Sequence, residues 1–188
     1  MPASMTSLPN LLTYGRILAV PAVIACFYVD GLWGRWLALA IFILAAVTDY
    51  FDGYLARLWN EQSSLGRMLD PIADKLLVSA TLLILAADGT LGWVSIVAAL
   101  VILCREILVS GLREYLAELK VVVSVTWLAK WKTTVQLVAL GFLIAGPAGD
   151  LVLPGTTMIG TALLWVAAAL TLYTGFDYFR AASVHLAD

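Results

Sequence analysis

Long apolar runs, each broken off by glycine, proline or aspartate, limit what this chain can fold into. Its 188 residues are 62% hydrophobic and only 13% charged, with a mean hydropathy of +0.95. A soluble domain carries about 25% charged residues. We therefore expect an all-α integral membrane protein, a single domain over residues 1–188 with six transmembrane helices. The expected helices cover residues 8–29, 33–59, 69–87, 91–116, 124–145 and 155–181, with Pro71 in the first turn of the third and Asp70 as its cap.

Lysine and arginine are distributed unevenly along this pattern. Of the 11 basic residues, only Arg35 falls in the connections after the first, third and fifth expected helices. The other ten gather at the opposite helix ends, which the positive-inside rule makes cytoplasmic. Both termini are therefore expected on the cytoplasmic side. The net charge of −2 gives no reason to expect a nucleic-acid partner.

Four aspartates recur at fixed spacing across the second and third expected helices. The pattern reads Asp49-x-x-Asp52-Gly53-x-x-Ala56-Arg57, then eight residues, then Gly66-x-x-x-Asp70-x-x-x-Asp74. With a rise of 1.5 Å per residue from Gly34, Asp49 lies roughly 22 Å and Asp52 about 27 Å into the membrane. The third helix returns from that boundary. We therefore expect all four acids at one level near the cytoplasmic face, with each pair on one helical face.

Carboxylates at the edge of hydrocarbon are costly unless something neutralises them. Any one of these aspartates alone is more easily explained as an interfacial residue or a helix cap. Four together predict two bound divalent cations, and oxygen-only ligands favour Mg²⁺ or Mn²⁺ over Zn²⁺. Two such ions can clamp a phosphate between its attacking and leaving oxygens. A divalent-cation transporter is the alternative from another class, although transporter sites lie nearer the bilayer midplane.

The segment from Asp49 to Asp74 resembles the signature of the CDP-alcohol phosphotransferases. The resemblance implies a six-helix membrane enzyme, usually a homodimer, that moves a phosphatidyl or phosphoalcohol group from a CDP-linked donor to an alcohol. It implies that all four aspartates bind the two metals, and that Asp74 is the base for the acceptor hydroxyl. It also assigns residues to the CDP site, namely Asp52, Gly53, Ala56, Arg57 and Gly66.

Other segments bear on the acceptor alcohol. The opening of the first helix up to Arg16, the stretch from Arg105 to Leu119 and the stretch from Lys130 to Gln136 are similar to bacterial members of the family that join CDP-diacylglycerol to glycerol 3-phosphate. Such a member would act in the bacterial plasma membrane, facing the cytoplasm. Serine, inositol phosphate and phosphatidylglycerol are the alternative acceptors.

A dianionic acceptor needs a cationic pocket. The candidate residues for binding glycerol 3-phosphate are Arg105, Arg113, Lys130 and Lys132. For each of them, an anchor at the lipid headgroups is the alternative. A structural pair of Arg105 with Glu106 is as plausible as a ligand role. Asn10 and Thr13, one helical turn apart, are candidates for hydrogen bonds to the nucleotide, and a capping role is equally plausible.

Overall fold

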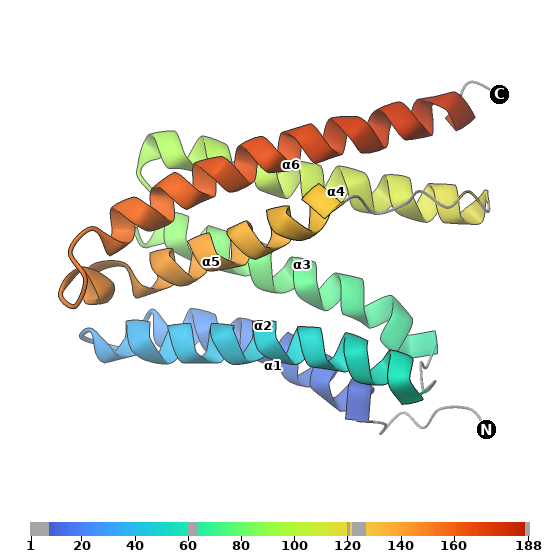
Figure 1. The fold of residues 1–188 in the computed structure, drawn as a ribbon. Coiled ribbons are helices and arrows are strands. Elements are labelled where there is room, and N and C mark those ends of the chain that lie inside the picture. Colours follow the sequence, from blue (N-terminus) through green and yellow to red (C-terminus); the bar gives the residue numbers. More distant parts are fainter. Residues whose placement is uncertain (1–7, 60–63, 120, 122–126, 187–188) are drawn as a thin grey trace. The chain divides into compact units, whose positions relative to one another are not determined.

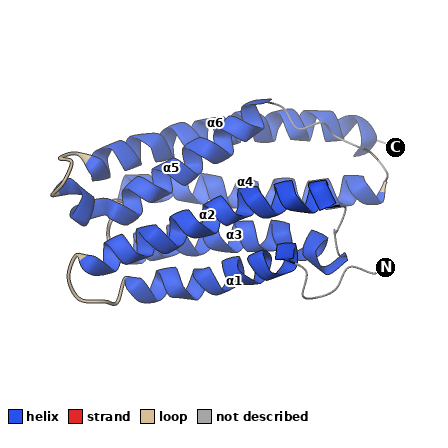
Figure 2. Ribbon diagram, turned by 60° about the horizontal axis from the view of Figure 1, so that its bottom comes forward, coloured by secondary structure: helices blue, strands red, loops and turns tan. Residues whose placement is uncertain are grey.

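The computed structural model describes the backbone of residues 8–59, 64–119, 121 and 127–186, and their side chains except those of 8–9, 50–59, 64–65, 67, 129–130, 181–182 and 184–186. These residues form helices and turns without a strand, as the sequence predicts (Figure 2). The helices are α1 (Leu8–Cys26), α2 (Trp33–Trp59), α3 (Ser64–Ala87), α4 (Trp93–Glu118), α5 (Trp127–Asp150) and α6 (Thr156–Leu186).

The helix boundaries agree with the sequence prediction for α2 and differ by up to five residues at one end of α3, α5 and α6. Helix α3 begins at Ser64, five residues before the expected start. Pro71 therefore lies inside the helix, and the prediction that Asp70 caps a helix beginning there is wrong. An internal proline is tolerated in apolar helices because neighbouring helices and side chains compensate for the missing hydrogen bond.

The chain divides into two compact units. Unit 1 comprises residues 1–90 and 141–157, and unit 2 comprises residues 91–140 and 158–188. In unit 1, α1 packs against both α2 and α3 (Figure 1). The buried side chains of unit 1 include Val23, Phe42 and Leu82, and those of unit 2 include Ile102 and Leu164.

Helix α5 is interrupted where the sequence predicts its end. Gly146 has φ +41° and ψ −124°, which is not helical, and Pro147 follows it. A side chain at position 146 would be strained and would also meet Arg35, whose Nη1 lies 3.2 Å from the site of a Cβ. The interruption leaves helix carbonyls without helical partners. Arg35 Nη1 donates to two of them, the carbonyls of Leu143 at 3.5 Å and Ile144 at 3.4 Å.

Arg35 also ties the neighbouring connections of unit 1 together. It forms an ion pair with Asp88, and its Nη2 donates to the Thr90 hydroxyl at 2.9 Å. The guanidinium lies over the Phe27 ring, 4.5 Å from the centroid. One arginine thus joins the ends of α1, α3 and α5, and its charge is matched by one carboxylate.

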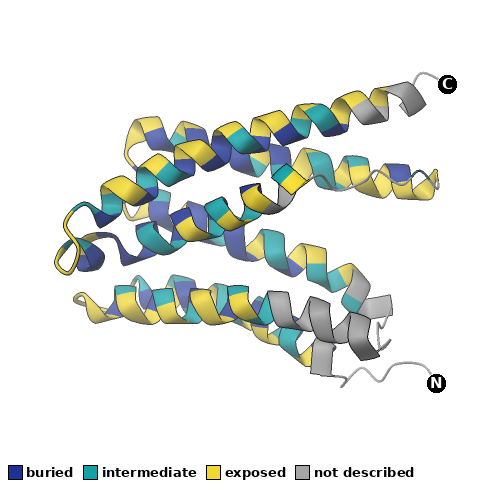
Figure 3. Ribbon diagram, in the orientation of Figure 1, coloured by how far each residue is buried: buried dark blue, intermediate teal, exposed yellow. Residues whose placement is uncertain are grey.

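Large apolar side chains cover much of the described surface, in the pattern expected for contact with lipid. Figure 3 shows exposed residues alternating with buried ones along α6. Trp33 and Trp93 are 82% and 90% exposed. Among the described residues, Trp93–Glu118 and Thr156–Arg180 are long and apolar enough to cross a membrane.

Candidate active site

The acid site consists of aspartates on α2 and α3 in unit 1. The structure describes three of the four predicted side chains: Asp49 on α2, and Asp70 and Asp74 one turn apart on α3. All three are partly exposed, and Asp70 lies near enough to Asp49 for the two carboxylates to repel each other. Asp52 is in α2, but its side chain lies outside the described set.

Helix α1 supplies one partner to each acid-bearing helix. Arg16 Nη1 lies 2.5 Å from Asp49 Oδ1, and the Thr13 hydroxyl donates to Asp70 Oδ1 at 2.6 Å. Thr13 and Arg16 are three positions apart, almost one turn, so both side chains project from the same face of α1. Two short contacts from one helix therefore hold one carboxylate on α2 and one on α3.

The residues on this face of α1 are buried. Asn10 and Thr13 are each 2% exposed, and Arg16 is 1% exposed. The sequence prediction gave Asn10 and Thr13 to the nucleotide; in this structure Thr13 bonds an acid of the site. The sequence prediction missed Arg16. The available signal was an arginine in an apolar helix, which needs an acidic partner, placed three residues after Thr13.

The described donors fit a hard divalent cation. They are carboxylate oxygens, the ligands that Mg²⁺ prefers, with no imidazole or thiol among them. Asp49 keeps 44% of its side chain exposed although Arg16 covers one oxygen, so a ligand can reach it. Among the described side chains, no three acidic, histidine or cysteine groups lie close enough to hold one ion, a set that leaves out Asp52.

The remaining residues predicted for the CDP site fall mostly outside the described side chains. Those of Asp52, Ala56 and Arg57 are not described, and Gly53 lies in the same stretch of α2. Gly66 lies in the first turn of α3, partly exposed, one turn before Asp70.

The basic cluster consists of Arg105, Glu106 and Lys132 in unit 2. Glu106, on α4, accepts from Arg105 Nη1 at 3.2 Å and also forms an ion pair with Lys132 of α5. Arg105 is 9% exposed and Lys132 is 5% exposed. The predicted pair of Arg105 with Glu106 is present. The sequence prediction missed that the same carboxylate also holds Lys132, because residues 26 apart on two helices give no periodic signal.

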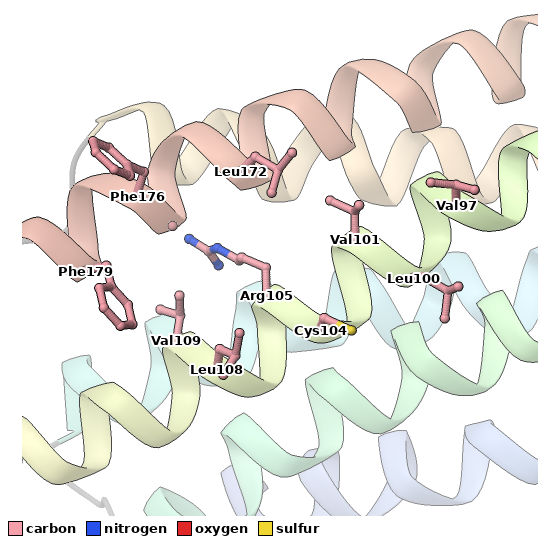
Figure 4. Close-up of a pocket in the computed structure, with 11 residues that line it drawn as sticks. Val97, Leu100, Val101, Cys104, Arg105, Leu108, Val109, Leu172, Phe176 and Phe179 are labelled. Carbon is pink, nitrogen blue, oxygen red and sulfur yellow. The ribbon is translucent and has the colours of Figure 1, made fainter.

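Helix α6 completes the surroundings of Arg105. Its Nη2 donates to the Thr174 hydroxyl at 3.0 Å, and a Cβ at Gly175 would lie 3.0 Å from Arg105 Cγ. Arg105 also borders an apolar groove of about 500 Å³ between α4 and α6 (Figure 4). The lining is otherwise formed by side chains such as Val101 and Phe176. The small residue on α6 therefore lets the arginine lie between the two helices.

Of the other two residues predicted to bind the acceptor, the structure describes the side chain of Arg113 but not that of Lys130. Arg113 Nη2 donates to the Tyr178 hydroxyl at 2.9 Å, and its guanidinium lies 5.6 Å from the centroid of that ring. Lys130 is in α5, but its side chain lies outside the described set. The structure thus brings Arg105 and Lys132 together on Glu106, and it gives Arg113 an aromatic partner of its own.

Residues 6–173 match the family model described as CDP-alcohol phosphatidyltransferase. That range includes all of α1 to α5 and both groups of charged residues described above. It confirms the family resemblance predicted from the spacing of the aspartates.

Curated relatives align with the chain over nearly its whole length. A protein of Cereibacter sphaeroides is 44% identical over 217 aligned positions, covering 97% of this chain and 98% of its own. One from Rickettsia bellii is 47% identical over 175 positions, covering 93% and 94%. One from Shigella flexneri is 41% identical over 184 positions, covering 97% and 98%. All three are named CDP-diacylglycerol–glycerol-3-phosphate 3-phosphatidyltransferase.

Proposed function

Because the chain belongs to the CDP-alcohol phosphatidyltransferase family, we propose that it transfers the phosphatidyl group of CDP-diacylglycerol to glycerol 3-phosphate. The products are phosphatidylglycerol phosphate and CMP, which makes the protein an enzyme of phospholipid biosynthesis. The observation that carries this proposal is the near full-length identity of 41–47% to relatives named for that reaction.

The proposed setting is the bacterial plasma membrane, crossed six times, with both termini and the acid site on the cytoplasmic side. The one-sided distribution of lysine and arginine supports this orientation. The apolar surface and the two helices long enough to cross a bilayer support insertion. A homodimer is the proposed assembly, on the family resemblance alone.

The acid site is proposed to bind two divalent cations, Mg²⁺ or Mn²⁺, through Asp49, Asp52, Asp70 and Asp74. When bound, such ions neutralise the pyrophosphate and stabilise the charge that develops as CMP leaves. The oxygen-only donor set among the described residues supports this assignment. The nucleotide is assigned to Asp52, Gly53, Ala56, Arg57 and Gly66, with Asn10 and Thr13 on α1; Thr13 acts through Asp70, to which its hydroxyl donates.

Asp74 is the proposed general base. It takes the proton from the primary hydroxyl of glycerol 3-phosphate, and the hydroxyl oxygen attacks the β-phosphorus of CDP-diacylglycerol. The bond from that phosphorus to the bridging oxygen breaks, and CMP departs with the oxygen. The partial exposure of Asp74 supports this role, since a buried carboxylate would not meet a soluble substrate.

The acceptor phosphate is proposed to bind Arg105, Arg113, Lys130 and Lys132. The gathering of two cations on one carboxylate supports this, because Arg105 and Lys132 both contact Glu106. A phosphate dianion would compete with Glu106 for the two cations. Serine carries no phosphate and would not need this excess.

An acceptor comparison tests the proposed reaction. The purified full-length protein in detergent micelles receives CDP-diacylglycerol and Mg²⁺, with glycerol 3-phosphate, serine or inositol phosphate in separate reactions, and CMP release is measured. We expect CMP release in the reaction with glycerol 3-phosphate and not in the reactions with serine or inositol phosphate. Release with serine or inositol phosphate but not with glycerol 3-phosphate would contradict the acceptor assignment while leaving the family intact.

A further inference from the structure

Helix α1 reaches both acid-bearing helices of unit 1 with two neighbouring side chains. Arg16 binds Asp49 of α2 at 2.5 Å, and Thr13 bonds Asp70 of α3 at 2.6 Å. Both contacts go to the Oδ1 atom of their carboxylate. Two side chains of α1 thus each hold one carboxylate oxygen of the acid site.

The burial of these residues argues against a role at the membrane surface. An arginine that anchors a helix to lipid headgroups extends its charge toward water. Arg16 is only 1% exposed, and Thr13 only 2%. Asp49, by contrast, keeps 44% of its side chain exposed. The buried partners therefore lie behind the acids, and the acids present their open side to solvent or ligand.

We propose that Thr13 and Arg16 are positioning residues that orient Asp70 and Asp49 for binding divalent cations. The inference rests on the proposed cation-dependent reaction and adds the residues that shape its acid site. Groups that hydrogen-bond a metal ligand fix its orientation, and losing one typically costs 10–100-fold in metal affinity or activity.

The threonine gives the cleaner test because its substitution changes no charge. Thr13→Val keeps the shape and removes the hydroxyl. We expect Mn²⁺ to bind the Thr13→Val variant about 10–100-fold more weakly than it binds the parent. Electron paramagnetic resonance of Mn²⁺ with each purified full-length protein measures this binding. Thr13→Ser, which keeps a hydroxyl, should restore binding. The matched control is Thr81→Val on α3, since Thr81 is equally buried and donates to the Leu77 carbonyl of its own helix at 2.8 Å.

Arg16 allows positioning to be separated from charge. Arg16→Lys keeps the positive charge but loses the rigid planar fork of the guanidinium. If Arg16 positions Asp49, Arg16→Lys should weaken Mn²⁺ binding as Thr13→Val does. If Arg16 contributes only charge, Arg16→Lys should bind like the parent. Arg35→Lys is the control, because Arg35 lies 14 residues before Asp49 on α2, about 21 Å along the helix.

The order of measurements distinguishes this inference from the function on which it rests. Mn²⁺ binding by the parent protein is measured first, and its absence would overturn both the cation site and the positioning role. If the parent binds Mn²⁺ and Thr13→Val and Arg16→Lys bind it equally well, only the positioning role is overturned. Thermal unfolding of each variant identifies any that fails to fold. If Thr13→Val fails to fold, Thr13→Ser becomes the test: it should bind Mn²⁺ as the parent does, and weak binding by Thr13→Ser counts against the inference.

Discussion

The acid site of unit 1 and the basic cluster of unit 2 have opposite charge arrangements. In the acid site, the guanidinium of Arg16 pairs with Asp49, one of three described aspartates on two helices. In the basic cluster, the single carboxylate of Glu106 meets two cations. Among the described side chains, Arg16 is buried and Glu106 is partly exposed. The difference matches the proposal that the acid site binds cations and the basic cluster binds a phosphate.

From this comparison we expect each group to be more than a structural ion pair. A buried pair that serves structure alone is best balanced, because any excess charge adds a desolvation cost. Arg35 and the exposed Asp88 form a one-to-one ion pair in unit 1. The acid site and the basic cluster are unbalanced in opposite directions, which fits cations at one and a phosphate at the other.

The largest effect is expected from removing the proposed base. Asp74→Asn keeps the size of the side chain and removes its ability to accept a proton at neutral pH. We expect CMP release to fall on the order of 10³-fold, within the range for loss of a general base. The measurement is turnover of purified protein with saturating Mg²⁺, with circular dichroism to verify the helices.

A matched control uses the exposed Asp30 in the connection between α1 and α2. Asp30→Asn removes an aspartate that the proposal leaves outside the site, and its turnover should equal that of the parent. If Asp74→Asn turns over at the rate of Asp30→Asn, Asp74 has no part in proton transfer.

The next largest effect concerns the acceptor. Lys132→Gln removes one of the two cations that contact Glu106, and with it one proposed contact to the acceptor phosphate. Hydrogen bonds to charged groups contribute about 1.5–3 kcal/mol. We therefore expect the KM for glycerol 3-phosphate to rise roughly 10–100-fold, with the KM for CDP-diacylglycerol unchanged.

The control for this change is Arg180→Gln, which removes an exposed cation of the same unit. A general loss of positive charge would raise both KM values in both variants. If Lys132→Gln affects the KM for CDP-diacylglycerol more than that for glycerol 3-phosphate, the basic cluster binds the nucleotide rather than the acceptor.

The balanced pair provides the third test. Arg35→Gln removes the donor to two helix carbonyls and the partner of Asp88. Because its charge is matched by one carboxylate, we expect a loss of stability of about 1.5–3 kcal/mol and no change in turnover per folded molecule. Thermal unfolding in micelles and active-site-normalised turnover measure the two quantities. A change in turnover at temperatures where the variant is folded would show that an ion pair with matched charges can still contribute to activity.

The sequence predicted most of the helices well because helix formation depends largely on local rules. Helix α2 has the predicted bounds, and the α5 helix breaks at Gly146 as the glycine–proline pair indicates. The first residue of α3 could not be predicted from the local sequence. Pro71 suits the first turn of a helix and is also tolerated inside a packed helix. Proline fixes its own φ angle, whereas the first residue of a helix depends on tertiary packing.

Partners across helices were the least predictable feature. Periodicity shows that Thr13 and Arg16 share a face, but it does not say which helix that face meets. The contacts with Asp70 and Asp49 appear only once α1 packs against both α2 and α3. The same holds for Lys132, whose bond to Glu106 depends on how α5 packs against α4.

The smallest expected effect involves an acid that has neutral donors in place of a cation. Asp150 lies outside the expected spans, and hydrogen bonds from the Thr157 hydroxyl at 2.5 Å and amide at 3.1 Å hold its pKa below the usual value. A pKa that is lower in the folded state stabilises the protein above the unfolded value of about 3.9, and that contribution is lost as pH falls through the folded pKa. Thr157→Val should therefore lower the unfolding temperature slightly at neutral pH. The difference from the parent should shrink below about pH 4, and a difference that stays constant from pH 7 to pH 3 would show that the hydroxyl acts through packing and not through the charge of Asp150.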